Sequence, residues 1–121
     1  MDGSNSALAA KYISQFRSLL RENERLLTAS ASISVNISED YGRGAGDGTL
    51  GLTNERVIHV GSRLGNIAIE RSDIRSASKK WIVIPGSSQL DIVAQKAGEP
   101  YAAMSFYCGT AFCKDLLKIL S

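Results

Sequence analysis

The chain has 121 residues, a formal net charge of +2, and 44% hydrophobic against 21% charged residues. This length fits one domain, and this composition is typical of a soluble globular protein rather than of a disordered or membrane-spanning one. The charge is well below that of a dedicated nucleic-acid-binding protein, so nucleic acid is not an expected partner. No apolar run approaches the roughly 20 residues that cross a bilayer, and no secretory signal is visible, so we expect a cytoplasmic protein.

The first predicted element is a long amphipathic helix from Ser6 to Leu27, where apolar side chains recur at steps of three and four residues. Its apolar stripe comprises Leu8, Tyr12, Phe16, Leu19 and Leu20, followed by Leu26 and Leu27. The stripe has two interpretations. It packs across the sheet of its own domain, or it docks to another copy or to a protein partner.

From Ala31 the apolar period changes to two, and the alternation of Ile33, Val35 and Ile37 with small polar residues predicts a half-buried strand. The glycine-rich stretch from Tyr41 to Gly48 then breaks the periodicity and is expected to be a mobile loop.

The remaining chain reads as short strands followed by a helix. Strands are predicted within Thr49–Thr53, Val57–Val60, Ile67–Ile69, Ile74–Ile84, Leu90–Val93 and Tyr101–Cys108. Thr110 to Leu120 return to helical spacing and predict a closing amphipathic helix. About seven antiparallel strands and one terminal helix predict an α+β domain in which a strongly bent sheet or open barrel is plugged by that helix.

The stretch from Gly48 to Ile58, GTLGLTNERVI, resembles the G-x-L-x-L-T-N-x-R-hydrophobic hairpin of bacterial PH-like domains (GRAM-related, YokE-like). The stretches Ile69 to Ile74 and Gly86 to Ile92 agree with later strands of that family. The resemblance implies a PH-type barrel with a C-terminal capping helix over residues 29–121, preceded by the N-terminal helix at residues 1–28. It also implies a role in binding peptides, other protein chains or sometimes lipid headgroups.

In physical terms the residues of the hairpin motif specify the fold and carry no chemistry. Its apolar residues fill a core, and Thr53 with Asn54 sets the turn that fixes the register. The first hairpin loop offers Arg43 as its only cation beside Glu39, Asp40 and Asp47, so its negative charge would repel a phosphorylated headgroup.

A second candidate surface is basic. Arg71, Arg75, Lys79 and Lys80 lie near Trp81, and an aromatic residue beside cations can anchor a protein to an anionic membrane. The plainer interpretation is a solvated strand face with Trp81 in the core.

The sequence carries no recognisable catalytic, metal or cofactor motif. His59 is the only histidine and has no nucleophile fixed beside it, the loop carboxylates lack the spacing of a calcium loop, and the loop glycines precede a strand rather than a helix. Cys108 and Cys113 are too few and too close in sequence to stabilise a fold through disulfides, and their spacing is not that of a CxxC redox or metal pair. We therefore predict that both are thiols in the core.

We therefore expect a non-catalytic PH-like binding module without a cofactor or metal. The preferred role is protein–protein interaction or self-assembly, with a homo-oligomer as one form of it. The alternative is peripheral binding to anionic lipid surfaces through the basic face, and a remote alternative is an enzyme whose site is assembled from distant residues.

Overall fold

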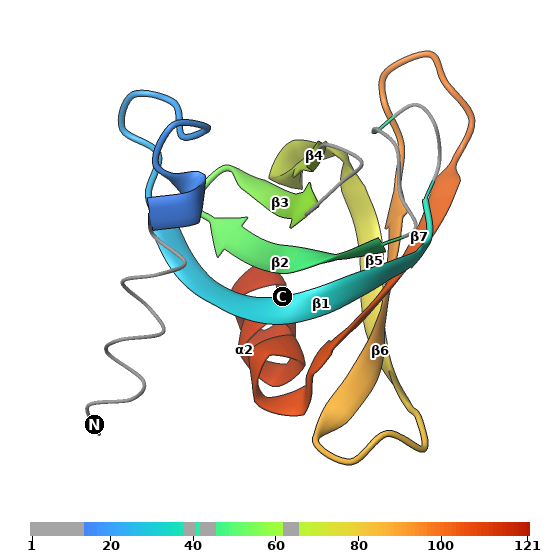
Figure 1. Cartoon of the computed structure of the whole chain (residues 1–121). Helices are drawn as coiled ribbons and strands as arrows, with labels where there is room; N and C mark the ends of the chain where they lie inside the picture. Colours follow the sequence, from blue (N-terminus) through green and yellow to red (C-terminus); the bar gives the residue numbers. More distant parts are fainter. Residues whose placement is uncertain (1–13, 38–40, 42–45, 62–65) are drawn as a thin grey trace.

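The structure is a computed structural model that describes residues 14–37, 41, 46–61 and 66–121. Seven antiparallel strands form one sheet in the order β4-β3-β2-β1-β7-β6-β5, and the sheet bends around helix α2 (Figure 1). The strands are β1 (Leu26–Asn36), β2 (Gly46–Thr53), β3 (Arg56–Gly61), β4 (Asn66–Glu70), β5 (Ile74–Trp81), β6 (Ser87–Ala94) and β7 (Ala102–Gly109). A 3-10 turn (Arg71–Asp73) joins β4 to β5, and α2 spans Thr110–Leu120. The predicted seven-stranded antiparallel sheet with a C-terminal helix is confirmed.

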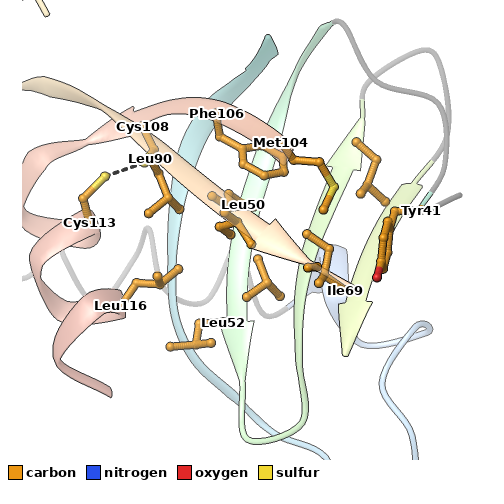
Figure 2. Close-up of a cluster of buried hydrophobic side chains, with 14 of the residues drawn as sticks. Tyr41, Leu50, Leu52, Ile69, Leu90, Met104, Phe106, Cys108, Cys113 and Leu116 are labelled. Atoms are coloured by element: carbon orange, nitrogen blue, oxygen red, sulfur yellow. Dashed lines mark hydrogen bonds between the residues drawn. The ribbon is translucent and has the colours of Figure 1, made fainter. Parts of the chain in front are cut away.

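The main core lies between the concave face of the sheet and α2 (Figure 2). β6 and β7 follow a strict two-residue alternation, which places Leu90, Ile92, Met104 and Phe106 on this inner face. Helix α2 contributes Leu116 and contacts β1, β5, β6 and β7. A strand alternates its side chains and a helix presents one stripe, so this packing buries both apolar surfaces at once.

A second apolar cluster covers the outer face of β2 and β3. Phe16 and Ile58 are fully buried there, separate from the main core. Gly51 makes room for this contact, because a Cβ atom at Gly51 would lie 2.7 Å from Phe16 Cζ and 2.8 Å from Leu26 Cδ1. β2 is therefore buried on both faces, and the segment preceding β1 packs on its own domain.

The prediction of a helix to Leu27 is wrong at its C-terminal end. Residues 14–16 are helical, turns follow, and β1 begins at Leu26, while the predicted helical residues before 14 lie outside the described residues. Asn23 has a left-handed backbone with φ of 68°, and the Arg21 amide donates to Glu24 Oε1 at 2.9 Å. These features end the helical path and turn the chain into the sheet.

The predicted mobile loop from Tyr41 to Gly48 also differs from the structure. β2 already begins at Gly46, and the Tyr41 side chain belongs to the main core. A Cβ atom at Gly48 would meet Val60 O at 2.1 Å, so here glycine permits the close approach of β3.

Candidate functional site

The connection between β5 and β6 forms a well-defined turn, which we call the hairpin tip (Trp81–Gly86). The Ser87 amide donates to Ile84 O at 3.2 Å, Pro85 occupies the second turn position, and Gly86 has φ of 75°. Proline followed by a residue with positive φ is the signature of a type II turn. The Ile84–Ser87 sequence thus fixes the direction of the tip.

The hairpin tip carries the two most exposed large apolar side chains of the described part of the chain, Trp81 and Val83. Trp81 is 83% exposed, Val83 80% and Ile84 47%. The placement of Trp81 in the core, the plainer of the two predictions, is wrong. Trp81 is the last residue of β5, at the end where the β5–β6 hairpin reaches past α2 (Figure 1). An exposed group of adjacent apolar residues is typical of an interaction site, whereas single exposed ones are common.

The tip lies beside the first turn of α2, at the lower end of the domain in Figure 1, and is hydrogen-bonded to it. The Thr110 amide donates to Gly86 O at 3.0 Å, and the Ser88 and Thr110 hydroxyls are 2.8 Å apart. A cleft of about 320 Å³ lies between these elements and includes Lys79 and Trp81 in its wall. The exposed side chains are therefore presented on an anchored support.

Strand pairing separates the two adjacent lysines of β5. Lys79 pairs with Leu90 and Trp81 with Ser88, whose side chains are buried on the inner face, so Lys79 and Trp81 lie on the inner side of the sheet. Lys80 pairs with Gln89 and faces the outer side. The structure thus brings Lys79 and Trp81 together at the cleft and directs Lys80 away from it.

The two lysines also differ in their charge environment. Lys80 Nζ lies 3.3 Å from Asp91 Oδ2, while no ion pair of Lys79 occurs among the described residues. Partial burial would raise the pKa of Asp91, but hydrogen bonds from Gln89, Ser105 and Lys80 outweigh it and hold this pKa below its usual value. Asp91 therefore stays ionised and offsets the charge of Lys80, which leaves Lys79 as the main cation at the cleft.

The two arginines of the predicted basic face lie elsewhere. Arg71 Nη2 donates to Ile119 O at 3.4 Å, near the C-terminal end of α2, and Arg75 Nη1 donates to Ser72 O at 3.2 Å. An 11-residue helix is about 16 Å long, and Thr110 at its other end borders the cleft. The five residues of the basic face therefore do not form one patch.

The apolar stripe of the N-terminal helix is visible only in part. Leu8 and Tyr12 lie outside the described residues, Phe16 is buried against its own sheet, and Leu19 and Leu20 are half-buried. For Phe16 the structure thus agrees with packing inside the chain, one of the two interpretations of the stripe.

His59 faces the main core. It is 2% exposed, its ring centroid is 5.7 Å from that of Phe106, and burial lowers its pKa despite a hydrogen bond with the Ser32 backbone. His59 is therefore neutral at pH 7 and lies apart from the cleft at the hairpin tip.

Sequence reasoning missed a buried polar clamp around the T-N-x-R motif. Arg56 Nε donates to Glu24 Oε2 at 2.9 Å, Arg56 Nη2 donates to Leu19 O at 2.8 Å, and Thr53 Oγ1 donates to Glu24 Oε2 at 2.6 Å. Hydrogen bonding from Arg56 lowers the pKa of Glu24 to about 2, although burial opposes the shift. The motif thus ties the segment before β1 to the β2–β3 hairpin, and only its resemblance to a family hairpin signalled its importance.

No group of three or more histidine, cysteine or carboxylate side chains is arranged to hold a metal ion within the ranges that the structure covers. None of the helices in those ranges combines the length and apolar character needed to span a bilayer.

Several solved structures resemble this chain, and two of them illustrate the similarity. The C-terminal domain of an unknown protein from Leishmania infantum aligns with a TM-score of 0.59 and 13% identity, covering 93% of this chain and 94% of that one. The Vps36 N-terminal PH domain aligns with a TM-score of 0.58 and 17% identity, covering 84% of this chain and 82% of that one. Neither a protein-family model nor a curated protein matches the sequence. The chain therefore has a PH-like fold.

Proposed function

We propose that the chain is a non-catalytic, GRAM-related binding module that attaches to anionic lipid surfaces through its hairpin tip. The observation that carries the proposal is the run of four apolar residues from Trp81 to Ile84, directly after Lys79 and Lys80. Trp81 and Val83 are at least 80% exposed. The proposal places the domain in the cytoplasm, where the inner leaflet of the plasma membrane supplies the negative charge.

The chemistry of the tip matches the boundary of a bilayer. Burying an exposed valine or isoleucine contributes about 1.5–3 kcal/mol, and tryptophan favours the level of the lipid headgroups. A lysine near an anionic surface contributes about 1 kcal/mol more. Lys79 precedes the tip on the inner side of the sheet and supplies this charge, whereas Lys80 faces the outer side, where Asp91 offsets its charge.

The anchoring of the tip favours this function further. Gly86 and Ser88 are bonded to Thr110, so the apolar side chains are held in place before binding. A contact surface that is already ordered loses little conformational entropy when it binds.

A second candidate function is protein binding or self-assembly through the outer face of β1. Ile33 and Val35 are 46% and 43% exposed there, and the half-buried Tyr107 pairs with Ile33 on β7. Point variants of this face are preferable to deletion of residues 1–28, because that deletion would remove Phe16 and Glu24, which are buried within the domain.

The test is co-sedimentation of the full chain with vesicles of phosphatidylserine and phosphatidylcholine at low salt. Val83→Asp should weaken binding roughly tenfold or more, since about 1.5 kcal/mol or more of apolar burial is lost. Val35→Asp is the matched control for an exposed valine on β1. Lys79→Glu should also weaken binding, whereas Lys118→Glu in the last turn of α2 is its matched control.

The controls separate the two candidate functions. Lipid attachment predicts that binding falls with salt and that only the Val83 and Lys79 variants are impaired. Equal sedimentation of Val83→Asp and the wild type would refute attachment through the tip. A mass in light scattering that falls only in Val35→Asp would instead favour self-assembly through β1.

A further inference from the structure

Two thiols meet where β7 leads into α2. The Cys108 and Cys113 Sγ atoms are 2.7 Å apart (Figure 2). Both thiols are free, and the residues are 2% and 0% exposed. Their burial confirms the prediction of core thiols. Their proximity is an additional feature, because the spacing of five residues gave no reason to expect contact.

We propose that Cys108 and Cys113 are a modification site at which a peroxide forms an intramolecular disulfide that fastens α2 to the end of β7. Sulfur atoms in a disulfide lie about 2.05 Å apart, so the sulfurs need to move by less than about 1 Å. Gly109 and the first turn of α2 lie between the two residues and supply the short connecting loop.

The two thiols have different roles in this reaction. Hydrogen bonding from Cys108 lowers the pKa of Cys113, and the positive charge of Lys79 adds to this effect. The same contact and burial raise the pKa of Cys108. The thiolate is the reactive form of cysteine, and of the two thiols only Cys113 is influenced by the positive charge of Lys79. Cys113 is therefore the attacking residue and Cys108 is the resolving one.

The reaction balances with hydrogen peroxide as the oxidant. The Cys113 thiolate attacks one peroxide oxygen, the O–O bond breaks, and the departing hydroxide takes up a proton to become water, leaving a sulfenic acid. The Cys108 sulfur then attacks the Cys113 sulfur. The new S–S bond replaces the S–O bond, and the hydroxyl leaves with the Cys108 proton as a second water.

Because both thiols are buried, peroxide must enter during local opening of the first turns of α2. The disulfide would oppose later opening. In the chain-entropy treatment, closing so short a loop should raise the Tm by roughly 5 to 10 °C. It would also hold Thr110, which supports Gly86 in the hairpin tip.

The experiment treats the reduced full chain with millimolar hydrogen peroxide, then denatures it and alkylates the remaining thiols with iodoacetamide. We expect a mass loss of about 2 Da from the two thiol hydrogens, no alkylation, a raised Tm, and reversal of all three by dithiothreitol. Alkylation of both thiols after peroxide would overturn the proposal. So would conversion of Cys113 to the sulfinic acid without a disulfide, or disulfides found only between chains.

Variants assign the two roles independently. In Cys108→Ser or Cys108→Ala the sulfenic acid at Cys113 should persist and react with dimedone, whereas Cys113→Ser should give no dimedone adduct. An adduct on Cys108 in Cys113→Ser, with none on Cys113 in either Cys108 variant, would contradict the assignment.

Discussion

Replacing Glu24 with glutamine tests the buried clamp that joins the N-terminal segment to the β2–β3 hairpin. The Glu24 side chain is 0% exposed and that of Arg56 12%, so their contact is largely shielded from water. Glutamine keeps the shape and one acceptor oxygen but removes the charge. Lowering a carboxyl pKa from 4.5 to about 2 corresponds to about 3 kcal/mol. We expect Glu24→Gln to reduce the free energy of unfolding by about 2 to 4 kcal/mol, measured by urea denaturation at pH 7.

The pH dependence gives an independent measure of the same contact. The pKa of Glu24 is lower in the folded than in the unfolded chain, so its stabilisation is complete above about pH 4.5 and is lost as the pH falls toward about 2. The wild type should therefore lose more stability than Glu24→Gln in this window.

Glu22→Gln is the matched control, because Glu22 is exposed in the same segment. Its free energy of unfolding should stay within about 0.5 kcal/mol of the wild type. If Glu24→Gln changes the free energy of unfolding equally little, the clamp does not stabilise the fold and the reasoning from burial and pKa is refuted.

Two further predictions concern the packing of the sheet. Gly48→Ala should destabilise the domain more than Gly51→Ala in thermal unfolding, because the added Cβ at Gly48 meets the Val60 carbonyl oxygen, whereas at Gly51 it meets the ends of side chains such as Phe16. An equal fall in Tm in the two variants would contradict this ranking. The pKa of His59 is lower in the folded chain than in the unfolded chain, so the unfolded chain binds the proton more readily. The wild type should therefore lose stability as the pH falls from roughly 7.5 to 5, and His59→Leu should lose less over this range. Parallel pH curves for both proteins would be the contrary result.

Much of the fold could be predicted because local patterns and tertiary packing agree. The range Thr110–Leu120 was predicted for the last helix and is the range of α2. The turn at Asn54 between β2 and β3 was also predicted correctly. In these segments the apolar spacing, the turn residues and the burial all favour one structure.

The N-terminal segment shows where periodicity misleads. Leu26 fits a helical stripe after Phe16, yet it starts β1, because residues 21–24 form a turn around Glu22 and Asn23 and β2 offers backbone pairing. Helical spacing over a few residues cannot reveal a partner strand that comes about 25 residues later in the sequence. Tyr41 was missed in the same way, since its glycine-rich neighbours hide its place in the core.

The sequence could predict which residues belong to the candidate site, but not how they are oriented or exposed. The sequence marks Lys79, Lys80 and Trp81 as a group, but strand pairing decides that Lys80 faces away from the other two. The exposure of Val83 and Ile84 depends on how far the β5–β6 hairpin extends past α2, which is a tertiary property.

The most direct test of attachment through the hairpin tip is the fluorescence of Trp81, the only tryptophan of the chain. The full protein is titrated with phosphatidylserine vesicles, with and without brominated acyl chains, which quench nearby indole rings. Attachment through the tip should produce a blue shift of the emission and quenching by brominated lipid, and both effects should be lost in Val83→Asp and at high salt. Unchanged emission with vesicles at low salt would contradict the proposed function.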